Sequence, residues 1–368
     1  MNAHPFVSRM PGWLSQGRFD SYVRDAGGDI DAACRLYEWG AALSAAAFEA
    51  VQYMEVVMRN AMDDAMRAHK NESIARIPWF LLPVCPDVKT QDRIDRDVAQ
   101  VRGRLRQIDP RREVRGQIIA GLSFGFWVHL VGPKHEDLWR QAMRNAFPNS
   151  SGSRKDVSAA LNALNIFRNK LAHHDSLLST DVSFRLSQIV DVVSWIDPQA
   201  AVWLRAKERV TAVLATRPVG RRDTVVVAAK DAWPLYQAVS AYVCQAGRSF
   251  QPIDYIAFYS SSAIQPEVPK IEDRIDNVDW SISGENHLRS TGQARDLQIA
   301  NIIAASREAG WQAGRYQVFL LTKPGEQEHL TLSTPIANLR SGRGSAFTQS
   351  QRYVVREQLR RAKTTADL

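Results

Sequence analysis

The sequence has little cysteine and lacks long apolar runs. Its three cysteines, Cys34, Cys85 and Cys244, are far apart and odd in number, so they predict neither a disulfide scaffold nor a zinc site of the C-x-x-C type. No run of about 18 uncharged apolar residues occurs, which argues against a membrane-spanning helix. Residues 1–13 also lack the basic and apolar segments of a secretory leader. We therefore expect a cytoplasmic protein without membrane association.

Length and charge set broad limits on organisation and partners. At 368 residues the chain is longer than one hydrophobic core usually organises, so two domains are expected. Apolar residues make up 45% and charged residues 23%, which excludes a largely disordered chain. The 47 basic residues outnumber the 39 acidic ones, for a net charge of +8. This surplus favours a polyanionic partner such as RNA without requiring one.

The first 217 residues carry the period of amphipathic helices. Asp29 to Ala68 has apolar residues at spacings of three and four, which predicts one long helix, or two in series, with Asp29 or Asp31 as cap. A nearly continuous apolar stretch, 117–131, predicts a buried helix. Further helices are predicted at 87–106, 135–147, 156–172, 181–195 and 198–215. In the helix 156–172, the residues expected to face the core are Val157, Leu161, Leu164, Ile166 and Phe167.

From Pro218 onward the pattern is that of mixed α and β structure. Strands are predicted at 224–229, 254–260, 316–321 and 329–333, and helices at 233–246 and 294–309. The chain therefore divides into an all-α helical bundle, residues 1–217, and an α+β domain, residues 218–368. Several positions of this domain could belong to a functional site or could be ordinary surface and core residues; they are Lys230, Asp231, Cys244, Arg248 and His287. The glycine-rich turn 341–345 is a weak candidate for an anion site.

Residues 166–175 concentrate reactive side chains at the end of a predicted helix. Asn169 and His173 are four apart and therefore neighbours on the helix surface. Arg168 and His173 are about 140° apart around the helix, so they can serve one site only at a groove edge or where the helix ends. Poor helix formers from His174 onward predict such an end.

This stretch resembles a known family. Arg168-Asn169-x-x-x-His173 is similar to the R-x4-6-H motif of HEPN domains, and the string RNKLAHHDSL resembles their Abi-like, or abortive-infection, branch. Two further segments resemble the same branch: E-x-x-x-R-N at Glu55–Asn60 and LSFGFWVHL at residues 122–130. The resemblance covers about residues 15–215. It implies a helical bundle that dimerises to form an RNase site without metal or cofactor, acting in antiphage defence or as a toxin.

The residue types fit that chemistry. RNA carries its own nucleophile, the 2′-hydroxyl, so the enzyme must move a proton and stabilise charge on the phosphate. Histidine titrates near neutrality, and arginine binds phosphate oxygens with a planar, permanently charged fork. We assign proton transfer to His173, phosphate binding to Arg168 and positioning to Asn169, with His174 and Asp175 in support. One motif supplies one arginine and one histidine, so two copies in a homodimer are expected to complete the site.

Each assignment has a structural alternative. Glu55 and Arg59 are an i,i+4 pair, which is either a surface ion pair or, with Asn60, a support for the motif. Cations at a helix C-terminus are favourable in themselves, so the motif could be structural. The arginines near the helix 87–106 either form a solvated face or follow an RNA backbone; they are Arg102, Arg104, Arg106, Arg111 and Arg112.

Three hypotheses follow. The first is an endoribonuclease whose second domain senses a phage-derived trigger or a small ligand, or selects the substrate. The second is a non-catalytic RNA-binding or dimerisation module with a structural motif. The third places an enzymatic activity in residues 218–368, with the bundle as scaffold.

Overall fold

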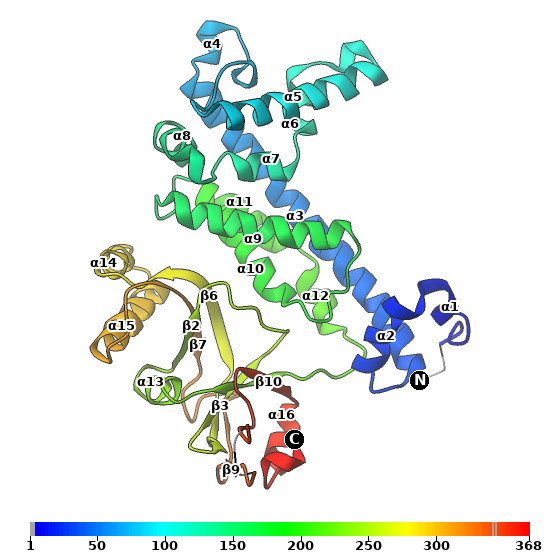
Figure 1. Cartoon of the computed structure of the whole chain (residues 1–368), viewed down its shortest axis with the longest axis vertical. Coiled ribbons are helices and arrows are strands. Elements are labelled where there is room, and N and C mark those ends of the chain that lie inside the picture. Colours follow the sequence, from blue (N-terminus) through cyan, green and yellow to red (C-terminus); the bar gives the residue numbers. More distant parts are fainter. Residues whose placement is uncertain (1–3, 341, 343) are drawn as a thin grey trace. The chain divides into compact units, whose positions relative to one another are not determined.

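The chain folds into two compact units. The computed structural model describes residues 4–340, 342 and 344–368. One unit, here the helical unit, comprises Tyr37–Leu177 and Val182–Arg217; the other, the α+β unit, contains Pro218–Leu368, the segment Leu178–Asp181 and the N-terminal residues through Leu36. Figure 1 shows helices throughout the first part of the chain and strands only in the second. The predicted succession of helical and α+β regions is confirmed at this level.

The helix α3 (Ile30–His69) is unbroken over 40 residues (Figure 1). The carboxylate of Asp29 accepts a hydrogen bond from the N–H of Ala32 at 3.0 Å, which satisfies a free donor of the first turn. Methionines four apart form a buried stripe along the second half of the helix: Met54, Met58, Met62 and Met66. The single long helix, its start and its cap are therefore as the sequence predicts.

Shorter helices complete the helical unit. They are α4 (Glu72–Ala75), η1 (Trp79–Leu81), α5 (Val88–Ile108), η2 (Pro110–Arg112), α6 (Arg115–Gly121), α7 (Phe124–His129), η3 (Pro133–His135), α8 (Glu136–Gln141), η4 (Met143–Ala146), α9 (Arg154–Ala172), α10 (Val182–Ile196), α11 (Pro198–Lys207) and α12 (Val210–Ala215).

Three of the predicted helices are interrupted. The expected helix over 117–131 is wrong as one element, because Ser123 has an extended backbone and its hydroxyl accepts from the N–H of Phe126, starting α7 anew. The helix over 198–215 breaks at Glu208, which is also extended. The helix over 135–147 is replaced by a 3-10 turn, the six-residue α8 and a second 3-10 turn.

The described residues of the α+β unit form three small sheets. The sheet order is β10-β1-β3-β4-β9 in the largest, β2-β7-β6 in the second and β5-β8 in the third. β1 pairs parallel with β3 and antiparallel with β10. The strands are β1 (Thr224–Ala228), β2 (Ala241–Gln245), β3 (Tyr255–Ser260), β4 (Ala263–Ile264), β5 (Glu267–Val268), β6 (Ile271–Asp279), β7 (Arg315–Leu321), β8 (Leu330–Thr331), β9 (Ile336–Ala337) and β10 (Gln351–Val354).

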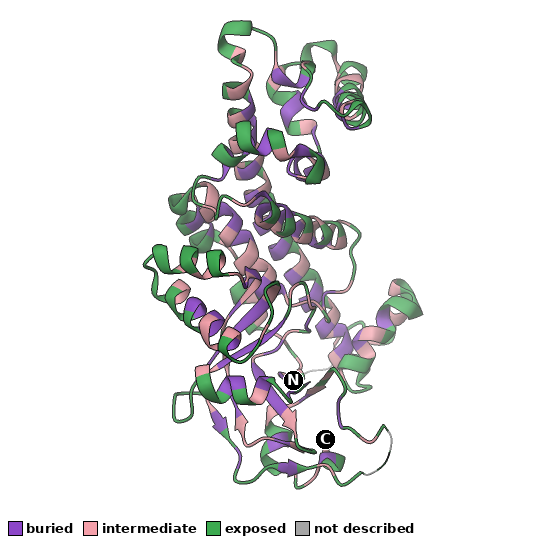
Figure 2. Cartoon of the chain, turned by 60° about the vertical axis from the view of Figure 1, so that its left-hand side comes forward, coloured by how far each residue is buried: buried purple, intermediate pink, exposed green. Residues whose placement is uncertain are grey.

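The helices of this unit are α1 (Met10–Leu14), α2 (Gln16–Asp25), α13 (Ala232–Val239), α14 (Ile282–Ser290), α15 (Ala294–Glu308), α16 (Arg356–Arg361) and the turn η5 (Thr365–Asp367). Three of them, α13, α15 and α16, share apolar cores with its strands. Figure 2 shows that the central strands are largely buried. The helix expected over 233–246 is wrong in its second half: Ser240 adopts a left-handed conformation that ends α13, and the next five residues form β2 against β7.

Candidate functional site

The helix α9 holds the reactive motif and is anchored at its start. The guanidinium of Arg154 is buried, with Nε 2.6 Å from a carboxylate oxygen of Glu136 and Nη1 3.0 Å from the carbonyl of Val131. Four of the five residues expected to face the core are buried; they are Val157, Leu161, Leu164 and Phe167. The fifth, Ile166, is 71% exposed. That expectation was wrong because Ile166 lies about 200° around the helix from Leu164.

The end of α9 is closed by a well-formed capping motif. The N–H of His174 donates to the carbonyl of Leu171 at 3.1 Å, and the N–H of Asp175 donates to the carbonyl of Lys170 at 3.0 Å. Together these bonds make a Schellman motif with His174 at the position that usually carries glycine. Its φ is +56°. The helix ends where the sequence predicts, and both His173 and His174 are exposed there.

Arg168 shares a half-buried environment with two residues of α3. Burial raises the pKa of Glu55, while the positive charges of Arg168 and Arg59 act in the opposite direction. Within the described residues Glu55 makes no ion pair. The Nε of Arg168 is buried without a hydrogen-bond partner in the described part of the chain, and its Nη1 lies 3.5 Å from Oδ1 of Asn169. The fold therefore brings together Glu55, Arg59 and Arg168, which are far apart in sequence.

Arg59 and Arg104 both contact the end of α6. Nη1 of Arg59 donates to the carbonyl of Ala120, and Nη2 of Arg104 donates to the carbonyl of Gly121, each at 3.4 Å. Cations at the C-terminal carbonyls of a helix are stabilising. Of the two alternatives for Glu55 and Arg59, the surface ion pair does not form among the described residues, because Arg59 is directed to this helix end. Asn60, the next residue, is exposed.

The other predicted RNA-binding arginines fall into two groups. Arg102 and Arg106 both hydrogen-bond the carboxylate of Glu113, Arg102 at 2.6 Å. The hydrogen bonds from Arg106 and then Arg102 lower the pKa of Glu113 to about 2. Arg111 and Arg112, on η2, are exposed and make no side-chain hydrogen bond or ion pair with any described residue. Only the second group has its charge free for a polyanion.

One face of α9 is exposed along its whole length. Its members recur at spacings of four and three residues, the period of a helix-packing seam, and are Ala159, Asn162, Ile166, Asn169 and His173. Small, amide and aliphatic side chains dominate this α9 face, and it includes two of the three predicted catalytic residues. The pattern of the sequence did not reveal this face, because Ile166 was expected in the core.

Two further candidates from the sequence are Cys244 and the glycine-rich turn 341–345. Cys244 is buried, and burial raises the pKa of its thiol to about 12, so it is not a nucleophile at neutral pH. Ser341 and Arg343 of the glycine-rich turn lie outside the described residues. Across residues 4–340, 342 and 344–368, no three His, Cys, Asp or Glu side chains group closely enough to hold a metal ion, and no helix is long and apolar enough to cross a membrane.

Comparisons with known proteins find no match to this chain. No family model, curated protein or solved structure matches it. The similarity to the Abi-like HEPN branch therefore stays a prediction carried by its three sequence segments.

Proposed function

We propose that this protein is a metal-independent endoribonuclease of the HEPN type, acting in abortive-infection defence or as a toxin. The observation that carries the proposal is the environment of Arg168. Its guanidinium Nε is buried without a partner in the described chain, and burial raises the pKa of the nearby Glu55 carboxyl, which forms no ion pair with a described residue. A half-buried guanidinium that is paired with no described carboxylate is suited to a phosphate. Arg59 and Arg104, in contrast, already bind carbonyl groups.

The proposed reaction uses the nucleophile of RNA itself. His173 takes the proton of the 2′-hydroxyl, the 2′-oxygen forms a bond to phosphorus, and the bond from phosphorus to the 5′-oxygen breaks. A second residue, acting as general acid, gives a proton to the leaving 5′-oxygen. The products are a 2′,3′-cyclic phosphate and a 5′-hydroxyl. Arg168 neutralises charge that develops on the phosphate oxygens, and Asn169 positions the backbone or substrate.

In this proposal, the second subunit of a homodimer supplies the general acid. The α9 face places Asn169 and His173 on the same exposed side as Ile166. Two such faces packed around a twofold axis bury Ile166 against its symmetry mate and double the number of histidines and arginines. This arrangement gives one His173 the role of base and the other the role of acid.

A non-catalytic RNA-binding or dimerisation role is the second candidate. The capping motif at His174 and the bonds of Arg59 and Arg104 to the end of α6 support this role, because they are contacts that stabilise the helix ends. Arg111 and Arg112 would then bind RNA backbone. This role predicts RNA binding without cleavage.

Cleavage assays on full-length variants separate the two candidates. Wild type, Arg168→Gln, His173→Ala and the control Arg205→Gln, an exposed arginine of α11, are compared on single-stranded RNA with EDTA present. We expect Arg168→Gln and His173→Ala to lose at least about 100-fold in rate, Arg205→Gln to match wild type, and the products to carry 2′,3′-cyclic phosphates. Circular dichroism checks the fold. Equal cleavage by all four proteins contradicts the site, and binding without any cleavage supports the second candidate.

A further inference from the structure

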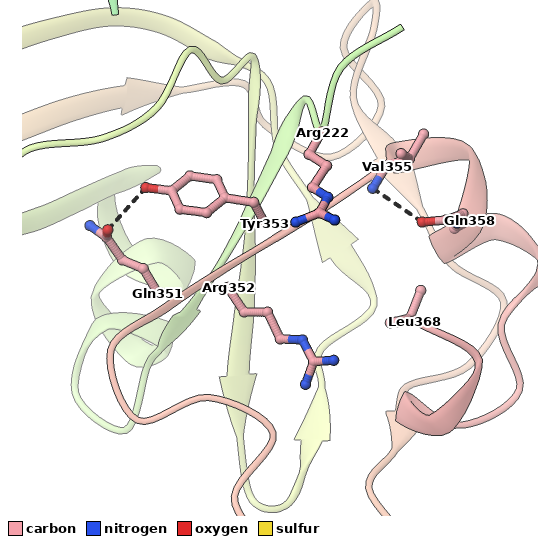
Figure 3. Close-up of a pocket in the computed structure, with 7 residues that line it drawn as sticks. All are labelled: Arg222, Gln351, Arg352, Tyr353, Val355, Gln358 and Leu368. Atoms are coloured by element: carbon pink, nitrogen blue, oxygen red, sulfur yellow. Dashed lines mark hydrogen bonds between the residues drawn. The ribbon is translucent and has the colours of Figure 1, made fainter. Parts of the chain in front are cut away.

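The α+β unit contains a polar pocket that the proposed ribonuclease site does not use. Its cavity volume is about 430 Å³, within the range of about 300–1,000 Å³ typical of small-molecule sites. It lies where β10 meets α16, and two arginines, Arg222 and Arg352, direct their guanidinium groups into it (Figure 3). None of its lining side chains is acidic, and the α-carboxylate of Leu368, which also lines it, makes no ion pair with a described residue.

Arg222 contributes a positive charge to the pocket, and no described acidic residue forms an ion pair with it. It is exposed and makes no hydrogen bond or ion pair with any described residue. Its neighbour Arg221 shows the contrast, because one of its guanidinium nitrogens lies 2.6 Å from both carboxylate oxygens of Asp254. The carboxylate of Asp254 is thus paired with Arg221. The carboxylate of Asp223, the next residue, accepts from the hydroxyl of Thr224 at 3.0 Å and from the N–H of Arg356 at 2.7 Å, so neither acid forms an ion pair with Arg222.

Arg352 is held in a defined orientation. Its guanidinium lies over the ring of Phe347, 4.1 Å from the centroid, and Nη1 lies 3.4 Å from the carbonyl of the same residue. Stacking of this kind fixes the plane of the fork. The remaining N–H donors have no partner among the described residues, so they are available on the pocket side.

Gln358 supplies a third donor to the lining. Oε1 of Gln358, on α16, accepts from the N–H of Val355 at 3.4 Å, as the dashed line in Figure 3 shows. The Nε2 group of the same amide makes no hydrogen bond with a described residue. Two other polar side chains of the lining are already bonded: the hydroxyl of Tyr353 donates to Oε1 of Gln351, and Nε2 of Gln351 donates to the carbonyl of Ser249. The pocket therefore presents two guanidinium groups and the amide of Gln358 as donors, with no acidic side chain in its lining.

We propose that this pocket binds the phosphoryl group of a small ligand. Two like charges in one pocket repel each other, and an anion between them replaces that repulsion with attraction. Phosphate matches the bidentate geometry of arginine and accepts from the amide of Gln358 as well. The site is independent of the motif in α9, so it holds whether or not the protein cleaves RNA.

Titration calorimetry on the full-length protein tests this site. The probes are pyrophosphate, AMP, and one oligonucleotide with either a 5′-phosphate or a 5′-hydroxyl. Arg222→Gln and Arg352→Gln are compared with Arg360→Gln, which removes the same charge from an exposed position on α16 that does not line the pocket. The purification tag stays off the C-terminus because Leu368 lines the pocket.

We expect wild type and Arg360→Gln to bind pyrophosphate or AMP with the same Kd, and each pocket variant to lose about 10- to 100-fold. Binding of AMP identifies a free nucleotide as the source of the phosphoryl group. Preference for the 5′-phosphorylated oligonucleotide over both AMP and the 5′-hydroxyl form identifies an RNA end instead. Absence of binding below about 10 mM, or equal losses in Arg360→Gln and the pocket variants, overturns the proposal.

Discussion

The N–H of Asp175 donates to the carbonyl of Lys170 at 3.0 Å, and this bond caps the C-terminus of the helix α9. Between the two lies His174 with a φ of +56°, a conformation in which a side chain is strained and glycine is not. The capping motif fixes the last turn of α9 and with it the exit of the chain beside His173. A strained residue therefore sits next to the proposed proton-transfer group.

Replacing His174 should reveal this strain. We expect His174→Gly to raise the free energy of unfolding by about 1 kcal/mol relative to His174→Ala. Both variants remove the imidazole, so their difference reports backbone conformation alone. Urea unfolding of the full-length variants measures it. Equal midpoints for glycine and alanine would contradict the left-handed assignment.

Glu55 should make stability depend on pH in a defined direction. Burial raises its pKa in the folded protein above the usual value of about 4.3, so the folded state binds the proton more tightly than the unfolded state does. Wild-type stability is then lost as the pH rises from about 4 through the folded pKa. Glu55→Gln does not titrate, and its advantage over wild type should grow between pH 4 and pH 7. The exposed Glu308→Gln is the control, and a constant difference would contradict the burial of Glu55.

The local features of the fold follow from sequence more readily than the site does. Asp29 and the run after His174 mark helix ends by short-range hydrogen bonding, and both ends appear as predicted. The break at Ser123 also comes from local hydrogen bonding, but the sequence did not predict it because apolar residues on either side of Ser123 indicated one continuous helix. In contrast, the meeting of Glu55 with Arg168 depends on how α3 packs against α9. No spacing within one helix encodes that contact, so only the family resemblance suggested it.

His135 should destabilise the protein in acid. It is 1% exposed, neither ring nitrogen has a partner among the described residues, and burial, followed by repulsion from His129, lowers its pKa to about 4. The unfolded state takes up a proton near pH 6.5, so stability falls between about pH 6.5 and 4 by up to about 1.4 kcal/mol per pH unit. His135→Leu should remove this dependence. Unfolding curves at several pH values measure it, with His287→Asn, at an exposed histidine, as the control that leaves the slope unchanged.

Ile166 should control assembly without affecting the fold of a single chain. Because it is 71% exposed, Ile166→Asp costs little in the monomer but places two buried charges at the proposed twofold interface. We expect the Kd for dimerisation to rise at least about 100-fold and RNA cleavage to fall with it. Sedimentation measures the first effect, and Ile74→Asp, which is 81% exposed on α4, is the matched control.

Mixing experiments then test whether both copies contribute to one site. If each active site needs two motifs, excess Arg168→Gln chains should capture wild-type chains in inactive heterodimers. Cleavage should then fall approximately with the square of the wild-type fraction, since only wild-type pairs remain complete. Arg168→Gln combined with Ile166→Asp cannot capture partners and should leave wild-type activity intact. A linear fall with the single variant would mean that each chain cleaves alone, and the exposed α9 face would then need another explanation.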